Sequence, residues 1–198
     1  MAEEMSAEAK AALENKEALD ALVADLSGSS RLTRQRSAAA LCEVANANIE
    51  LIAPYNKQII DALNRPEART RWECLDALTK LVEFESRLCD KAIAGAEASL
   101  FDEDNGQVRL SAMRFLCKYG STTPTRSDKV WSLIDEGIQC YHGDVEFNDM
   151  LAALVEFSQG KLSKDVKKAF AERMAFDAQN GRGTLKNRAE QIVANLGV

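Results

Sequence analysis

Residues 107–116 read Gln-Val-Arg-Leu-Ser-Ala-Met-Arg-Phe-Leu, and the spacing within this stretch recurs along the chain. Arg109, Ala112 and Leu116 follow one another at intervals of three and four residues, which places them on one face of a helix. Equivalent trios recur about every 38 residues. The five trios are Arg34, Ser37 and Leu41; Arg71, Cys74 and Leu78; Arg109, Ala112 and Leu116; Phe147, Met150 and Leu154; and Lys186, Ala189 and Val193.

A second apolar series lies between these trios and has the same period. Each member ends another helical stripe, so each period carries two helices, an A helix with the trio and a B helix after it. Two helices per repeat of this length indicate a helical solenoid. The members of the second series are Leu26, Leu63, Leu100, Ile138 and Phe176.

The repeat predicts one continuous domain over residues 1–198, almost entirely helical. A helix over residues 6–26 serves as the N-terminal cap, and a segment over 86–101 is predicted as one B helix. Pro54 either starts or kinks the first B helix, because proline is not tolerated in a helix interior. The predicted segments are a cap at 1–28, repeats at about 30–65, 66–103, 104–143 and 144–180, and a C-terminal helix at 184–196.

The pattern Val108, Arg109, Ala112 and Leu116 resembles the first helix of a HEAT repeat, with the acidic residue Asp104 ahead of it. The resemblance extends over roughly residues 15–198. It implies an all-α fold, a right-handed α-α superhelix of about five HEAT-like helix pairs with an N-terminal cap helix. It also implies that the B helices line the concave face. Phe147 replaces the basic residue of the pattern, so the family's series of basic contacts between repeats should be interrupted there.

Composition limits the class of protein. Apolar residues make up 46% of the chain, which contains only 3 prolines and has a net charge of −6. No apolar run is long enough for a membrane helix, and the acidic N-terminus does not resemble a signal peptide. The 5 cysteines fall inside predicted helices. We therefore expect a cytoplasmic protein, with no membrane contact, whose cysteines are small core residues.

No catalytic, cofactor-binding or metal-ligating residues are predicted. His142 is the only histidine and lies near Cys140 and Asp144, without the further ligands that a metal site requires. No nucleophile motif surrounds His142. We therefore predict no cofactor and favour a non-catalytic protein over an enzyme.

Basic residues recur on the B helices. The positions nine residues before the core-facing ends point away from the A helices, since nine steps of about 100° leave half a turn. Three of these positions are lysines, and the other two are Glu17 and Pro54. The interpretation is either a groove for an anionic partner or ordinary solvated side chains. The predicted partner-binding residues are Lys91, Lys129 and Lys167, with Arg87, Arg126 and Lys164 beside them.

These features favour a non-catalytic HEAT-repeat scaffold or adaptor that binds an acidic protein or peptide on the concave B-helix face. One alternative is a nucleic-acid-binding protein similar to the HEAT-like DNA glycosylases of alkylation repair. That resemblance implies a strongly basic face with aromatic residues and a catalytic carboxylate, from which this acidic chain departs. A second alternative is a HEAT-like bilin lyase or accessory protein. Only the type of repeat supports this alternative.

Overall fold

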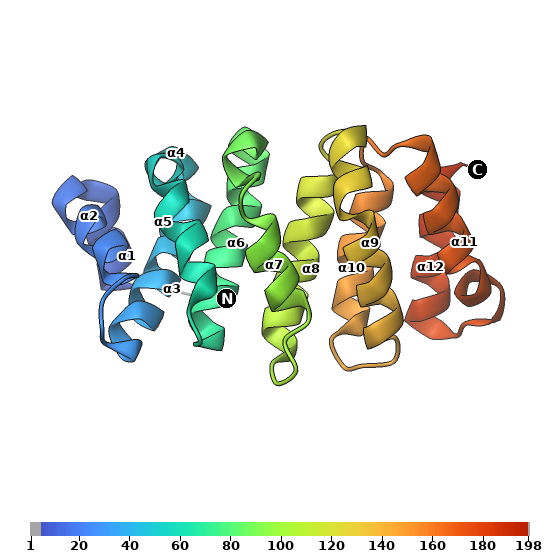
Figure 1. Ribbon diagram of the computed structural model, residues 1–198, viewed down its shortest axis with the longest axis horizontal. Coiled ribbons are helices and arrows are strands. Elements are labelled where there is room, and N and C mark those ends of the chain that lie inside the picture. Colours follow the sequence, from blue (N-terminus) through green and yellow to red (C-terminus); the bar gives the residue numbers. More distant parts are fainter. Residues whose placement is uncertain (1–4, 198) are drawn as a thin grey trace. The chain divides into compact units, whose positions relative to one another are not determined.

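The computed structural model describes residues 5–197, which contain helices, turns and no strand. The chain forms two compact units, residues 1–99 and 100–198. Figure 1 shows the order of the helices. The first unit contains α1 (Ala7–Glu14), α2 (Lys16–Asp25), α3 (Arg31–Ala47), α4 (Ile49–Ile52), η1 (Ala53–Tyr55), α5 (Asn56–Asp61), η2 (Ala62–Asn64), α6 (Ala68–Glu85), η3 (Ser86–Cys89) and most of α7 (Ile93–Leu100). The second contains α8 (Gly106–Gly120), α9 (Pro124–Tyr141), α10 (Phe147–Ser158), α11 (Lys164–Asn180) and α12 (Gly183–Leu196).

The middle members of the trios lie in the core of each unit, as their spacing predicts. Every middle member is at most 2% exposed. In the first unit α3 packs against α6, and in the second α10 packs against both α8 and α12. The A helices thus bury the face that carries the trios, and the buried apolar area stabilises the packing. The middle members are Ser37, Cys74, Ala112, Met150 and Ala189.

Four members of the second apolar series are buried, as predicted, and the prediction for the fifth is wrong. Leu26, Leu63, Leu100 and Ile138 are at most 3% exposed, but Phe176 is 72% exposed. The buried stripe of α11 contains Asp177 instead. This carboxylate lies 3.1 and 3.2 Å from Nε2 of His142. The polar pair therefore takes the inward position and turns the phenylalanine beside it toward solvent.

The predicted cap helix over residues 6–26 is two helices, α1 and α2. Asn15 between them has an extended backbone (φ −133°, ψ 118°), and its side chain accepts a hydrogen bond from the N–H of Glu17. Asparagine favours this N-cap role over a helix interior. Ser6, which caps α1, donates from its Oγ to Glu43 at 2.7 Å and so ties α1 to α3.

The predicted B helix over residues 86–101 is also divided, into η3 and α7. Cys89 and Ala92 are both fully buried, and the N–H of Ala92 donates to the carbonyl of Cys89 across a tight turn. A 3₁₀ turn aligns residues three apart on one side, as this pair requires. Lys91 therefore lies in a turn and not on a helix. Pro54 lies in the 3₁₀ segment η1, so the first B helix is kinked at the proline and does not begin there.

An arginine clamp connects successive A helices in the first unit. The Arg34 side chain is 10% exposed and forms an ion pair with Glu67, which is 4% exposed. Its Nη1 also donates to the carbonyls of Gly28 (2.7 Å) and Ser29 (3.0 Å). The guanidinium thus binds the loop before its own helix and the residue that caps the next A helix. Because all of these acceptors are supplied, a charge can remain buried.

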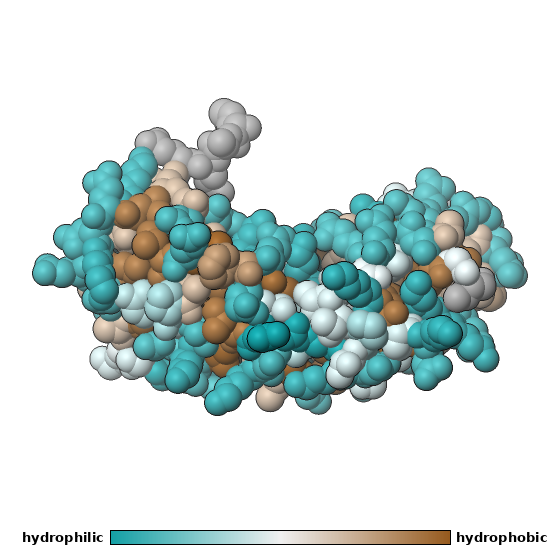
Figure 2. Space-filling view, turned by 90° about the horizontal axis from the view of Figure 1, so that it is seen from above, coloured by the Kyte–Doolittle hydropathy of each residue, from teal (hydrophilic) through white to brown (hydrophobic). Residues whose placement is uncertain are grey.

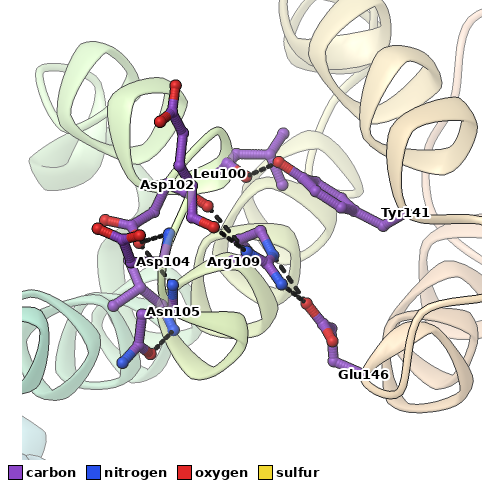
Figure 3. A network of polar contacts seen from close by, with 9 residues as sticks. Leu100, Asp102, Asp104, Asn105, Arg109, Tyr141 and Glu146 are labelled. Atoms are coloured by element: carbon purple, nitrogen blue, oxygen red, sulfur yellow. Dashed lines mark hydrogen bonds and ion pairs between the residues drawn. The ribbon is translucent and has the colours of Figure 1, made fainter.

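The second unit repeats this clamp around Arg109, shown in Figure 3. Nε of Arg109 donates to Glu146 at 2.7 Å, and Nη1 donates to the carbonyl of Asp102 at 2.9 Å. The guanidinium also lies 4.9 Å from the ring centre of Tyr141. The N-cap of α8 is Asn105, whose side chain accepts from the N–H of Val108. The backbone geometry that makes Arg109 reach Asp102 is therefore fixed by the helix start.

The clamp is absent from the fourth trio, as the resemblance implied. Phe147 is 4% exposed, and its ring centre lies 5.1 Å from that of His142. In the fifth trio, Nζ of Lys186 donates to the carbonyl of Gln179 at 3.3 Å. This repeats the backward contact of the arginines.

We expect Arg34→Ala to destabilise the protein by about 3–5 kcal/mol, because it leaves the carboxylate of Glu67 buried without its partner. The exposed Arg36, on the same helix, provides the matched control. Arg36→Ala should change the free energy of unfolding by less than about 0.5 kcal/mol. Urea unfolding followed by circular dichroism measures both. Equal effects of the two changes would contradict the clamp.

The pH dependence of stability tests the same contact. Hydrogen bonds from Arg34 lower the pKa of Glu67 below its ordinary value of 4.5. A lowered carboxyl pKa gives stability that is fully present above the ordinary value and is lost as the pH falls through the lowered one. We therefore expect wild type and Glu67→Gln to differ most near neutral pH and to converge in acid. A difference that stays constant with pH would contradict this assignment.

Candidate partner-binding surfaces

The six predicted basic residues divide between the two units. Arg87 lies in η3 and Lys91 in the following turn, both exposed. The other four, on α9 and α11, are Arg126, Lys129, Lys164 and Lys167.

In the second unit, two segments that lead into B helices are joined by hydrogen bonds. The N–H of Lys161 donates to the carbonyl of Ser121 at 2.8 Å. The N–H of Ser163 donates to Oγ of Ser127 at 3.0 Å, and Oγ of Ser163 donates to Asp128. These contacts hold the starts of α9 and α11 side by side. The basic residues that the sequence places on both segments therefore share one surface.

We call this surface the basic junction and define it by the charged residues of segments 118–129 and 161–168. These segments hold seven basic and two acidic residues, in a chain whose net charge is −6. The acidic residues are Asp128 and Asp165. The basic residues are Lys118, Arg126, Lys129, Lys161, Lys164, Lys167 and Lys168.

Most of the junction is available to an external anion. Lys129, Lys161 and Lys164 are exposed, and Lys167 is half-buried. None of these four forms an ion pair with another residue of the range 5–197. Lys168 lies 4.0 Å from Glu172. A cluster of unpaired cations raises the local potential more than isolated lysines do.

One junction cation is fixed in place. The guanidinium of Arg126 lies 4.9 Å from the ring centre of Tyr119, and its Nη1 contacts Oγ1 of Thr122 at 3.2 Å. The helix starts add to the positive potential, because the N-terminus of a helix carries a partial positive charge. Thr123 and Ser163 cap α9 and α11 through their side-chain oxygens.

Lys118, Lys161 and Lys168 were not among the predicted residues, because the prediction followed the helical period of the B helices. Lys118 lies at the end of an A helix and Lys161 in a loop, so neither belongs to the B-helix series. The missed signal was local density, since four lysines fall within residues 161–168.

In the first unit, Arg87 and Lys91 line a cleft of about 570 Å³ between α5 and the η3–α7 segment. We call it the α5–α7 cleft. Lys57 on α5 lines it as well and was not predicted, because Pro54 occupies the periodic position in that repeat.

The face in Figure 2 is largely hydrophilic over the second unit, whereas hydrophobic residues gather over the first.

A smaller cleft of about 310 Å³ lies between α2 and α5. Tyr55 at its wall donates a hydrogen bond to Asp20, which also pairs with Lys16 at 2.7 Å. Hydrogen bonds from Lys16 and then Tyr55 lower the pKa of Asp20. The hydrogen bond to this carboxylate raises the pKa of the Tyr55 phenol. The side chains of Asp20 and Tyr55 are thus already paired within the protein.

His142 pairs with Asp177 and does not meet Cys140 or Asp144 at a shared site. Across residues 5–197, no group of three or more His, Cys, Asp or Glu residues is placed to hold a metal ion. Trp131 is half-buried and its ring centre lies 5.2 Å from that of Phe170. Trp131 on α9 therefore packs against α11, and Trp72 is half-buried too.

Solved structures show what this arrangement resembles. No protein-family model and no curated protein matches the sequence. A designed armadillo repeat protein in complex with the peptide (KR)4 has a TM-score of 0.77 at 14% identity, covering 93% of this chain and 84% of its own. An archaeal HEAT-like repeats protein from Thermococcus onnurineus NA1 has a TM-score of 0.55 at 16% identity, covering 96% and 91%. The chain has the fold of HEAT and armadillo repeat proteins.

An engineered protein with a TM-score of 0.75 and 16% identity, covering 96% of this chain and 88% of its own, agrees with this assignment. Within the HEAT/armadillo-like fold, the clamps and trios belong to the A helices. The basic residues of the junction belong to the B helices and their leading loops, except Lys118 at the end of α8. No helix in the described range has both the length and the apolar character that crossing a bilayer requires.

The cysteines of this HEAT/armadillo-like chain differ in burial. Cys42, Cys74, Cys89 and Cys117 are buried free thiols, as predicted, but Cys140 is exposed. It was predicted as a core residue and lies off the buried stripe of α9, which contains Ile134, Gly137 and Ile138. Burial, followed by nearby carboxylates, raises the pKa of the Cys42 thiol to about 12. The reactive thiolate is thus disfavoured at the buried sites.

We expect one thiol to react rapidly with a thiol-specific reagent in the native protein and all 5 to react after unfolding in denaturant. Mass spectrometry of iodoacetamide-treated protein measures the number and position of modified residues. Cys140→Ser should abolish the native reaction. A buried cysteine modified as fast as Cys140 would contradict the packing of its helix.

Proposed function

We propose that this protein is a non-catalytic repeat scaffold that binds an acidic protein or peptide segment on its B-helix side, with the basic junction as the electrostatic anchor. The observation that carries the proposal is the gathering of seven basic residues on two hydrogen-bonded segments of an acidic chain. Clustered charges of one sign steer and orient a partner of opposite charge.

Charge balance favours a short acidic segment over a nucleic acid. The chain has a sequence pI of about 5.0, whereas domains that bind nucleic acid are commonly basic overall. A long polyanion on the junction would meet repulsion from the acidic remainder of the protein. A short acidic segment, by contrast, can stay within the basic surface.

The structural neighbours support a peptide as the kind of partner. One designed armadillo repeat protein was solved with the peptide (KR)4, and another design is described as intended for modular peptide recognition. The fold can therefore present a peptide-binding surface. In this chain the charges of the junction are positive, so we infer the opposite sign for the peptide. We further propose that the chain is a single domain and that the protein is cytoplasmic.

Reversing two junction charges tests the proposal. We expect Lys129→Glu/Lys164→Glu to weaken binding of a fluorescein-labelled polyglutamate peptide about tenfold or more, because two attractive contacts become repulsive. Fluorescence anisotropy at low and moderate salt measures the affinity. Both residues are exposed and form no ion pair with another residue of the range 5–197, so the fold should tolerate the change.

The matched control is Arg31→Glu/Arg36→Glu, which makes the same charge change at two exposed residues of α3. It should leave polyglutamate binding within about twofold. Equal loss in both double variants would show that net charge alone matters and would overturn the assignment to the junction. Tighter, salt-sensitive binding of duplex DNA than of polyglutamate would replace the peptide with a nucleic acid.

A further inference from the structure

The α5–α7 cleft is the larger of the two clefts described in the first unit. Its volume of about 570 Å³ lies within the range of about 300–1,000 Å³ that ligand sites occupy. It lies between the B-helix segments of two successive repeats. A ligand there would contact both repeats at once.

Three cations stand on the walls of this cleft. They are Lys57 from α5, Arg87 from η3 and Lys91 from the turn before α7, and all three are exposed. None of the three forms an ion pair with another residue of the described range. The two carboxylates of the walls are Asp61 and Asp90, which leaves one net positive charge on the walls. The cleft therefore retains an excess of unsatisfied positive charge.

The remaining lining is apolar or uncharged. Ile60, Leu88 and Ala94 supply hydrophobic surface. The side-chain N–H groups of Asn56 and Asn64 donate to the carbonyls of Ala53 (2.9 Å) and Asp61 (3.3 Å). Each amide oxygen is thereby left as an acceptor for a peptide N–H.

Gly95 fixes the width of the cleft. A Cβ atom on Gly95 would lie 2.7 Å from Cβ of Leu63 and 2.8 Å from its Cδ1, closer than side chains pack. Only glycine lets α7 approach η2 this closely. The two walls are thus held at a set spacing by main-chain packing, which makes the cleft a preformed feature.

We propose that the α5–α7 cleft binds an extended peptide segment that presents a carboxylate to Arg87 and Lys91 and a neighbouring aliphatic side chain to Ile60 and Leu88. This inference rests on the proposed function and adds a second anchor with its own selectivity. The basic junction recognises negative charge alone, whereas the cleft recognises an acidic residue next to an aliphatic one. No aromatic residue lines the cleft, so it offers no stacking surface for a nucleobase.

A labelled peptide of alternating Glu and Leu residues, tested against the full chain, provides the probe. Alternating Glu-Gly and Lys-Leu peptides of the same length provide the comparisons. We expect the Glu-Leu peptide to bind at least tenfold more tightly than either. Arg87→Glu/Lys91→Glu should weaken its binding about tenfold, and Arg31→Glu/Arg36→Glu should change it less than about twofold.

Hydrogen exchange locates the bound peptide. The Glu-Leu peptide should slow amide exchange in residues 56–64 and 86–95 of the wild type, and Arg87→Glu/Lys91→Glu should abolish that protection. Equal binding of the Glu-Gly peptide would overturn the aliphatic contact. Equal or tighter binding of the Lys-Leu peptide would overturn the charge assignment.

Failure of this inference is distinguishable from failure of the proposed function. If Lys129→Glu/Lys164→Glu weakens binding of the Glu-Leu peptide and Arg87→Glu/Lys91→Glu does not, the cleft is not the site and the junction stands. If neither double variant weakens the binding of any acidic peptide, both proposals fall. If Arg87→Glu/Lys91→Glu weakens binding of the Glu-Leu peptide but Lys129→Glu/Lys164→Glu leaves binding of polyglutamate unchanged, the cleft stands and the junction does not.

Discussion

A guanidinium between successive A helices, buried at Arg34 and half-buried at Arg109, is the contact on which each unit depends. Arg34 and Arg109 occupy equivalent positions and make equivalent contacts. Each binds the loop that precedes its own helix and a glutamate about one repeat later in the sequence. Apolar packing alone sets no unique register between two helices. A buried charge that must meet particular carbonyls and one carboxylate does set it, because any other register leaves it unsatisfied.

Because the A helices carry the contacts that fix the packing, the side chains of the B helices and loops can differ between repeats. The two units use that freedom differently. In the second, hydrogen bonds between Ser121, Ser127 and Ser163 and their neighbours bring two basic segments together. In the first, the close approach of Gly95 to Leu63 sets the spacing between the walls of a cleft of mixed polarity. One surface selects by charge, and the other combines charge with an apolar contact.

The departures from the repeat pattern are concentrated at polar side chains. The period predicted Phe176 as core and the structure places Asp177 there, because the carboxylate meets His142 from the preceding repeat. Asn15 interrupts the predicted cap helix by capping a new one. A search for apolar period cannot detect either event, since both depend on a polar partner chosen by position in space or by local backbone geometry.

The sequence by itself determined the all-helical repeat, the buried middle positions of the trios and most helix boundaries. The reason is that apolar residues spaced three and four apart mark the buried face of each helix, and the same pattern recurs about every 38 residues. It also identified Lys129 and Lys164 as exposed basic residues. Only the tertiary structure decided that Lys161 joins them, and that Lys57, Arg87 and Lys91 share one cleft. Those groupings arise from contacts between segments more than 25 residues apart. Lys161 lies in a loop and Lys91 in a turn, where no helical period constrains them.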